Sequence, residues 1–223
     1  MLNWAEIDTV LLDMDGTLLD LHFDNYFWLE YLPARYAERM GVTVREARDD
    51  LFPRMQRVRG TIDWYCLDYW SGTLGVNVAA HKREIGHLVR FRPGAQRFLA
   101  ELARRGKRRV LVTNAHHDAL ALKLERTALR RCVEHIICAH DFRVPKEEQE
   151  FWYRLQEVQP FDPARTVLLD DSPGVLSSAK RYGIAHQLGI RRPDTTGPPV
   201  DWKEFPAVEA FEDLFAGSGE LSE

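Results

Sequence analysis

Four short apolar runs, each followed by a helical pattern, constrain the fold of this sequence more than any other feature. The apolar runs occupy residues 9–12, 109–112, 135–138 and 166–169. Amphipathic helical patterns follow them or precede the next run, at residues 93–102, 119–129, 147–158 and 173–182. Runs that are apolar throughout indicate a parallel sheet covered on both faces. The regular alternation of strand and helix therefore predicts an α/β fold with a doubly wound sheet.

Residues 21–90 interrupt this alternation. They are rich in aromatic residues and helix formers and contain no convincing strand pattern. Helical patterns cover residues 26–40, 43–58, 63–74 and 79–89. We therefore expect a core of residues 1–20 and 91–223 and an inserted helical domain of residues 21–90. Proline and glycine mark residues 191–200 as an irregular loop, and residues 217–223 are expected to form a frayed tail.

The charge balance argues against nucleic acid or a membrane surface as the partner. The 223 residues include 30 Lys and Arg against 34 Asp and Glu, a net charge of −4. The one basic cluster, residues 104–109, is expected to be the solvated end of a helix. No stretch approaches the length needed to span a bilayer. The first apolar run is flanked by Asp8, Asp13 and Asp15, which excludes a signal peptide there, so we expect a cytoplasmic protein.

The three cysteines, Cys66, Cys132 and Cys138, have spacings that match no zinc-binding pattern. Cys138 ends an apolar run and is expected to be a buried small hydrophobic residue. A sparse, odd set of thiols favours a reducing compartment.

The strongest chemical signal is the pair Asp13 and Asp15, which follows the first apolar run and precedes Gly16. Open α/β sheets bind ligands at the carboxyl ends of their strands. In an extended chain these two side chains would point to opposite faces, whereas a turn at Gly16 lets both reach one cavity. A helix-capping turn would explain one acid, but not two acids and a glycine.

Asp170 and Asp171 form a second acidic pair directly after another apolar run. One such pair could cap the helix that Pro173 begins. Two acidic clusters at the same end of a sheet repel each other unless a cation lies between them. Carboxylate oxygens suit a hard divalent cation, so the sequence predicts a Mg²⁺ site.

Polar residues also follow the other two apolar runs. Thr113 and Asn114 lie before a helix, where a hydroxyl and backbone N–H groups suit a phosphate oxygen. Lys146 follows the third run. Each signal is weak alone, since threonine, asparagine and lysine are common in solvated loops. Their position at the same predicted edge of the sheet makes them candidate phosphate-binding residues.

Together these elements resemble the haloacid dehalogenase superfamily. Each motif falls in the required order after its own predicted strand, and the motif residues are Asp13, Asp15, Thr113, Lys146, Asp170 and Asp171. The resemblance implies phosphoryl transfer in two steps through a covalent aspartyl-phosphate.

The resemblance also implies a role for each motif residue. Asp13 is the nucleophile, and Asp15 is the general acid for the leaving alcohol and then the base for water. Thr113 and Lys146 hold the phosphoryl oxygens. In this superfamily an acid two residues after the nucleophile marks phosphatases and phosphomutases, whereas dehalogenases lack it.

The metal ligands implied by the resemblance are Asp13, Asp171 and the main-chain carbonyl of Asp15. Asp170 is a further ligand, directly or through water. The adjacent acidic pair departs from the spaced acids of the family, which leaves open whether Asp170 or Asp171 makes the closer metal contact. Pro145 precedes the lysine instead of following it.

The helical insertion resembles the α-helical cap of the phosphoglycolate-phosphatase-like branch. Over nearly the whole chain the sequence further resembles bacterial GMP/IMP nucleotidases of this superfamily, in residues 8–17, 23–28, 64–70, 113–116 and 145–148. That resemblance implies hydrolysis of purine nucleoside 5′-monophosphates. Phe23, Asn25, Trp64 and Tyr69 are the candidates to face the cleft and contact substrate.

Most aromatic residues of the insertion are expected to pack helices together instead. Helical spacing assigns Trp28, Tyr31, Leu67 and Trp70 to the core. His116 and His117 follow the phosphate-binding turn, where they either touch substrate or are ordinary loop residues.

The sequence is compatible with three functions. The first is a Mg²⁺-dependent nucleotidase for a small-molecule phosphate monoester, GMP or IMP. The second is a phosphatase of small sugar or acid phosphates, or a phosphomutase with the same motifs. The third is a binding module that kept the fold without the chemistry, which the intact motif residues disfavour.

Overall fold

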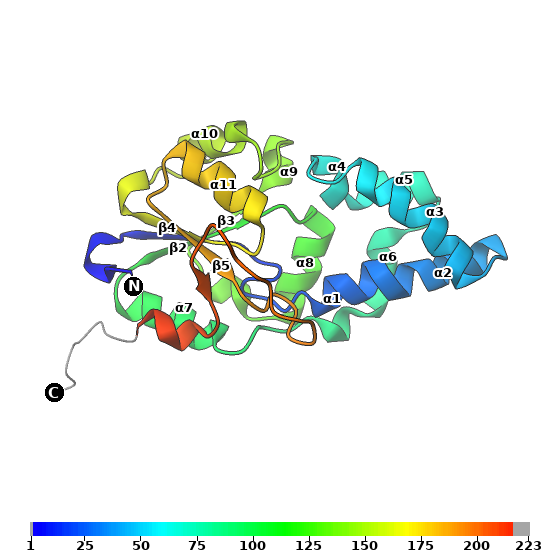
Figure 1. The fold of residues 1–223 in the computed structure, drawn as a ribbon, viewed down its shortest axis with the longest axis horizontal. Coiled ribbons are helices and arrows are strands. Elements are labelled where there is room, and N and C mark those ends of the chain that lie inside the picture. Colours follow the sequence, from blue (N-terminus) through cyan, green and yellow to red (C-terminus); the bar gives the residue numbers. More distant parts are fainter. Residues whose placement is uncertain (1, 216–223) are drawn as a thin grey trace.

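The computed structural model describes residues 2–215, and a six-stranded parallel sheet lies at the centre of this part of the chain (Figure 1). The strands are β1 (Thr9–Leu12), β2 (Arg108–Thr113), β3 (His135–Cys138), β4 (Thr166–Leu169), β5 (His186–Ile190) and β6 (Ala207–Val208). Their order across the sheet is β3-β2-β1-β4-β5-β6. The predicted α/β fold class is confirmed. The predicted tail, residues 217–223, lies outside the described residues.

Alternate side chains of β1 enter two different hydrophobic clusters, one on each face of the sheet. Val10 and Leu12 pack in the cluster that includes Phe98. Leu11 packs in the cluster that includes Trp152. Helices cover both faces: α7 (Ala95–Arg104), α8 (His117–Arg126), α10 (Gln149–Val158) and α11 (Pro173–Tyr182). Full burial of such side chains stabilises the fold by about 1.5–3 kcal/mol each. The strand is apolar throughout because both faces are covered.

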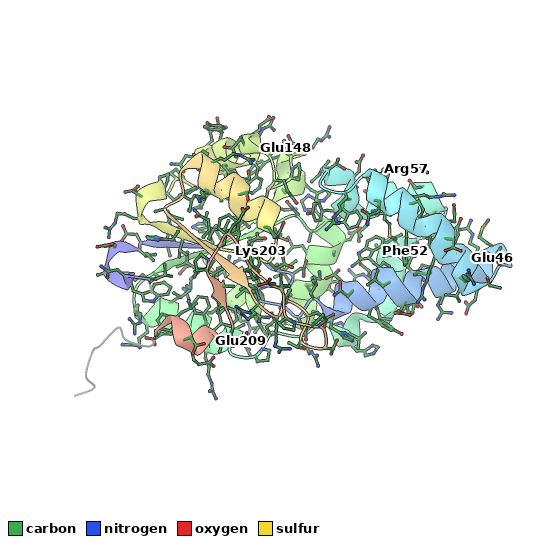
Figure 2. The ribbon with its side chains drawn as sticks, in the orientation of Figure 1. Glu46, Phe52, Arg57, Glu148, Lys203 and Glu209 are labelled. Atoms are coloured by element: carbon green, nitrogen blue, oxygen red, sulfur yellow. The ribbon has the colours of Figure 1, made fainter. Side chains whose placement is uncertain are left out.

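Residues 21–90, hereafter the helical segment, lie together at one end of the molecule, beside the sheet (Figure 1). Their helices are α1 (His22–Tyr26), α2 (Leu32–Met40), α3 (Val44–Arg57), α4 (Ile62–Tyr65), α5 (Leu67–Leu74) and α6 (Val78–Glu84). A π-helical turn, η2 (Phe27–Tyr31), joins α1 to α2. Figure 2 shows Glu46 at the outer end of α3 and Arg57 at the end closer to the sheet.

Two helices of this segment differ from the sequence prediction. The helix expected over 63–74 is interrupted at Cys66, which has an extended backbone and accepts a hydrogen bond from Tyr69 N at Sγ. The helix expected over 79–89 ends at Glu84, and a short 3₁₀ turn, η3 (Gly86–Leu88), follows. Elsewhere α8 ends at Arg126, three residues earlier than expected.

The chain enters and leaves the helical segment at adjacent points. Leu19 forms an antiparallel bridge with Phe91. Asp20 N donates to Arg90 O at 2.9 Å, and the Arg90 guanidinium forms an ion pair with the buried Asp20 carboxylate at 2.8 Å. The two connections therefore run side by side between the segment and the sheet.

The sequence patterns did not reveal β5 and β6. β5 contains His186, Gln187 and Gly189, which weaken its apolar character, and β6 has only two residues. Gly189 is required by packing, because a Cβ there would lie 2.4 Å from the Trp202 ring. The Trp202 indole also donates to Ile190 O at 2.9 Å and holds the loop after β5 against the sheet.

Candidate active site

The pairing of β1 with β4 brings the two acidic pairs together. Leu12 is in register with Leu169, so Asp13 and Asp170 leave neighbouring strands at the same edge of the sheet. Asp13 N donates to Leu169 O at 3.0 Å, which extends the pairing by one residue. This edge is the carboxyl end of the parallel strands, where open α/β sheets hold ligands.

Lys146 lies between the two acidic pairs. Its Nζ is 2.5 Å from Asp13 Oδ1 and 2.7 Å from Asp170 Oδ2, and it also donates to Val112 O at 3.1 Å. The side chain is only 2% exposed. The two carboxylates raise the pKa of Lys146 above its usual value although burial opposes them. One buried cation therefore neutralises part of the charge of Asp13 and Asp170.

Asp171 adds a third carboxylate that Lys146 does not contact. One oxygen from each of Asp13, Asp170 and Asp171 lies within 4.8 Å of the others. Burial first, and then the charges of Asp13 and Asp170, raise the pKa of Asp171 well above its usual value. Such a cluster is more stable with a divalent cation among its oxygens.

The chemistry of these donors fits a hard divalent cation. Asp170 already accepts from Lys146 and from Ser172 N at 2.9 Å. Asp171 has no ion pair in the described structure, so its oxygens are available to a cation beside those of Asp13 and Asp170. Gly16 makes room for this arrangement. Its φ is +78°, and a Cβ there would lie 2.3 Å from Asp171 Oδ2.

Asp15 is paired with a buried lysine that the sequence analysis did not single out. Lys123 Nζ lies 2.6 Å from Asp15 Oδ1 and 2.7 Å from Asp24 Oδ2. Lys82 Nζ lies 2.5 Å from the other oxygen of Asp24. Burial raises the pKa of Asp15 to about 6, with Lys123 lowering it and Asp24 raising it. Burial likewise raises the pKa of Asp13 to about 6.

This row of charges joins the helical segment to the sheet. Lys82 and Asp24 belong to the segment, whereas Lys123 and Asp15 belong to the rest of the chain. Lys82 also lies over aromatic rings, 4.8 Å from the Phe23 centroid and within 5.4 Å of the Trp28 centroid. One feature of the sequence could have revealed Lys123. It lies among the buried apolar residues of α8, and a buried charge needs a partner of opposite charge.

Thr113 and Asn114 end β2 beside this cluster. Thr113 is buried, and its hydroxyl accepts from Ala115 N at 3.0 Å. Asn114 Oδ1 accepts from Lys146 N at 2.9 Å, and Asn114 Nδ2 donates to Glu147 Oε2 at 3.0 Å. The Asn114 side chain thus holds the backbone of Lys146 in place. Its side-chain oxygen is already engaged in the protein.

A cavity of about 730 Å³ opens over these residues. Its floor contains Asp13, Asp15, Thr113, Asn114, Lys146, Asp170 and Asp171. The helical segment contributes the opposite wall, with Asn25, Trp28, Arg59, Trp64 and Tyr65. Across the cavity Tyr65 donates from its hydroxyl to Glu147 Oε1 at 2.7 Å. The volume lies in the range of sites for small molecules.

The structure corrects part of the expectation about aromatic residues. Phe23 is 1% exposed and packs in the hydrophobic core under Lys82 instead of facing the cavity. Tyr69 packs edge-on against Trp70 and does not line the cavity. Trp28, assigned to the core by helical spacing, packs against the core cluster and also lines the cavity. Helical periodicity does not show which side of a helix a cleft occupies.

The remaining candidate substrate-contacting residues differ in their position relative to the cavity. Asn25 lines the cavity and donates to Asp194 Oδ2 at 2.9 Å, which ties it to the loop after β5. Trp64 lines the cavity and is half-buried. His116 lines the cavity at the start of α8, whereas His117 is 53% exposed and lies beside Asp141.

A parallel sheet with an acidic cluster and a buried lysine at the carboxyl ends of its strands, covered by a helical wall, is the arrangement of a phosphatase. The chain belongs to the haloacid dehalogenase-like hydrolase family, whose model matches residues 7–183. It is 40% identical over 211 residues to the GMP/IMP nucleotidase YrfG of Escherichia coli, an alignment that covers 95% of each chain. The protein of the same description from Shigella flexneri has the same identity and coverage.

A solved structure confirms the fold. The structure of a HAD phosphatase from Thermococcus onnurineus has a TM-score of 0.79 at 20% identity and covers 96% of this chain and 98% of its own. In residues 2–215 no helix has both the length and the apolar character needed to cross a bilayer.

Proposed function

We propose that this hydrolase is a Mg²⁺-dependent purine nucleoside 5′-monophosphatase that acts on GMP or IMP. The observation that carries the proposal is the position of Asp13 and Asp15 on one turn, beneath a cavity whose far wall is aromatic. The nucleotidase activity named for the relative that is 40% identical supports the choice of substrate. The helical segment, residues 21–90, would act as the cap that selects the leaving group.

In the first step Asp13 attacks phosphorus and forms an aspartyl-phosphate while the nucleoside 5′-oxygen leaves. The three N–H groups of Lys146 Nζ donate to Asp13, Asp170 and Val112 O, so one of them would turn from its present acceptor to a phosphoryl oxygen when substrate binds. Thr113, at the end of β2, contributes its hydroxyl from the same floor. A Mg²⁺ ion held by Asp13, Asp171 and the main-chain carbonyl of Asp15 would neutralise charge on the phosphoryl group.

Asp15 supplies the proton to the leaving oxygen. Its pKa of about 6 leaves a fraction of the side chain protonated near neutral pH, and a bound phosphate dianion would raise that pKa further. In the second step the same carboxylate, now ionised, accepts a proton from the water that attacks the aspartyl-phosphate. Lys123 beside it stabilises the ionised form between the two steps.

The base would lie against the wall made by the helical segment. Trp28 and Trp64 offer ring surfaces, and Arg59 offers a cation with its side chain exposed in the cavity mouth. Aromatic faces stack on any purine, so this wall favours a purine leaving group without distinguishing guanine from hypoxanthine. A small sugar phosphate would leave most of the wall without contact.

The decisive experiment measures phosphate release from a panel of monoesters in the presence of Mg²⁺. The panel contains GMP, IMP, AMP, a pyrimidine nucleotide, glucose phosphates and phosphoglycolate. The proposal expects the highest kcat/KM for GMP and IMP. A preference for a sugar phosphate, or conversion of one sugar phosphate into its isomer, would instead identify a sugar phosphatase or a phosphomutase. No release from any ester would indicate a binding module.

A further inference from the structure

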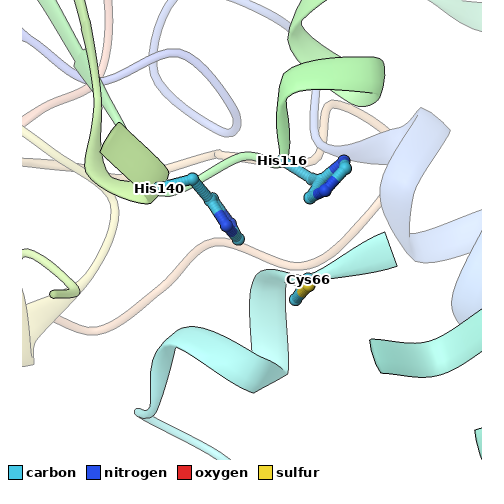
Figure 3. Close-up of side chains that lie close together, drawn as sticks. All are labelled: Cys66, His116 and His140. Carbon is cyan, nitrogen blue, oxygen red and sulfur yellow. The ribbon is translucent and has the colours of Figure 1, made fainter. Parts of the chain in front are cut away.

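A second group of metal-binding side chains lies between the helical segment and the rest of the chain. Cys66, His116 and His140 each offer one donor atom, and the three atoms lie within 4.8 Å of one another. Cys66 precedes α5 of the segment, His116 precedes α8, and His140 lies on α9 (Ala139–Phe142). Figure 3 shows the three side chains projecting from these three elements toward the same space.

His140 has a ring nitrogen available for a metal. Its Nε2 atom is buried and has no hydrogen-bond partner in the described structure. The backbone of Asn114 lies beside the same ring and acts to raise its pKa, although burial outweighs this effect. A buried ring nitrogen without a partner is available as a metal ligand. Burial lowers the pKa of His140 to about 4, so the ring is neutral.

Cys66 and His116 complete the set of donors. Tyr69 N donates to Cys66 Sγ at 3.4 Å, so the sulfur lies at the start of α5. His116 is 8% exposed as a residue. Its Nε2 lies 3.4 Å from Oδ2 of Asp68, an 82% exposed side chain that is not part of the 4.8 Å group.

We propose that Cys66, His116 and His140 form a binding site for a borderline-soft transition-metal ion of the Zn²⁺ type, with water in the fourth coordination position. Sulfur and imidazole donors select such ions over Mg²⁺. Ligand atoms of a tetrahedral zinc site lie about 3.3–3.7 Å apart, so the three side chains need to close by at most about 1.5 Å. The bound ion would fasten α5 to α8 and α9.

Cysteine spacing did not reveal this site, because only one of its ligands is a cysteine. The two histidines come from segments that are distant in the sequence and meet only through the parallel sheet. The site is chemically distinct from the carboxylate cluster of Asp13, Asp170 and Asp171, which contains oxygen donors alone.

The test is a titration of the full-length, chelator-treated and reduced protein with Co²⁺, followed by absorption spectroscopy. A tetrahedral site with one thiolate gives visible d–d bands and a near-ultraviolet sulfur-to-cobalt charge-transfer band. We expect both bands to saturate at one Co²⁺ per chain and to disappear when Zn²⁺ is added in equal amount. Zn²⁺ should also raise the melting temperature.

Matched variants assign the ligands. Cys66→Ser should abolish the charge-transfer band, and His140→Asn should weaken Co²⁺ binding by roughly tenfold or more. Cys132→Ser, at a half-buried cysteine outside the cluster, should change neither. Asp171→Asn should remove any Co²⁺ held by the carboxylate cluster and leave the charge-transfer band unchanged. Circular dichroism checks that each variant is folded.

Two results would overturn the proposal. One is the absence of a charge-transfer band in the wild-type protein with excess Co²⁺. The other is a band that survives Cys66→Ser or that is lost with Cys132→Ser. Neither result bears on the phosphohydrolase proposal, because no turnover is measured.

Discussion

Lys123 of α8 forms a buried ion pair with Asp15, which follows β1, and 2.6 Å separates Nζ from Oδ1. Because Asp15 is the proposed proton donor, the lysine sets the pH at which that proton is available. The same Nζ contacts Asp24 of the helical segment at 2.7 Å. Proton transfer and the position of the segment are therefore linked through one ammonium group.

Lys123→Met should shift the pH profile of activity. Removing the ammonium eliminates a contact that lowers the pKa of Asp15, so this pKa should rise. The alkaline limb of kcat/KM should move to higher pH, and stability should fall by about 3–5 kcal/mol because a buried carboxylate loses its partner. Lys203→Met, at an exposed lysine, is the control. An unchanged pH profile with reduced stability would limit Lys123 to a structural role.

Asp13→Asn should reduce hydrolysis of every substrate to near background. The substitution keeps the size of the side chain but removes the anionic nucleophile and one metal ligand. Rapid-quench trapping of the phosphorylated protein checks the mechanism directly, because label should appear in the wild type and be absent from the variant. Turnover above a few per cent of the wild-type value would contradict nucleophilic catalysis by Asp13.

Asp15→Asn should slow the reaction according to the leaving group. The variant cannot donate a proton, so a nucleoside 5′-oxygen should leave much more slowly than p-nitrophenolate, which needs no proton. The ratio of the two rates is the measurement. An equal loss for both esters would mean that Asp15 acts on the metal or on the aspartyl-phosphate and not on the leaving group.

Mg²⁺ should stabilise the protein by an amount that grows as the pH rises from about 4 to 7. Burial raises the pKa of Asp13 from 3.8 to about 6, and that of Asp171 also rises. Without metal, the stability associated with these groups is fully present below pH 3.8 and is lost as the pH rises through the raised pKa values. A bound cation removes this loss.

The measurement for that prediction is the difference in melting temperature with and without Mg²⁺ at each pH. Other groups that titrate in this range, such as His140, contribute equally to both samples and cancel. Asp171→Asn should abolish the difference at all pH values. A pH-independent stabilisation by Mg²⁺ would place the ion elsewhere.

Trp64→Ala tests the wall of the cavity as the base-binding surface. Stacking on an aromatic ring is worth about 1–3 kcal/mol per base. The corresponding loss in kcat/KM for GMP and IMP is roughly 5- to 150-fold. Hydrolysis of p-nitrophenyl phosphate should change little, and Tyr153→Ala, at an exposed ring, is the control. An equal loss on all substrates with a lower melting temperature would make Trp64 a packing residue.

The strands that carry the motif residues could be predicted from sequence because burial on both faces imposes a simple pattern. β1 and β4 are apolar throughout, and their register alone brings Asp13 beside Asp170. β5 could not be predicted in the same way. Its Gly189 is required because the Trp202 ring leaves no room for a Cβ, and glycine has a low strand propensity.

The site residues that directly follow paired strands could be predicted from the sequence. Those whose position depends on the packing of a helix against other elements could not. The position of Lys123 depends on how α8 packs against α6 and η3 of the helical segment, and no local pattern encodes that packing. For the same reason the sequence did not show that Phe23, a candidate for the cleft, is buried in the core, or that Trp28 both packs against the core and lines the cavity. Whether a helical residue is buried by a neighbour or faces a cavity is a tertiary property.

The hydrogen bond from Tyr65 to Glu147 has a thermodynamic consequence. Glu147 also accepts from Asn114, and Asn114 accepts from the backbone of Lys146, so three consecutive contacts connect the helical segment to the lysine proposed to bind phosphate. Coupling of this kind is reciprocal. If closure of the segment improves the alignment of Lys146 for phosphate, then bound phosphate must favour closure to the same degree, and inorganic phosphate left after hydrolysis will delay the opening that releases it.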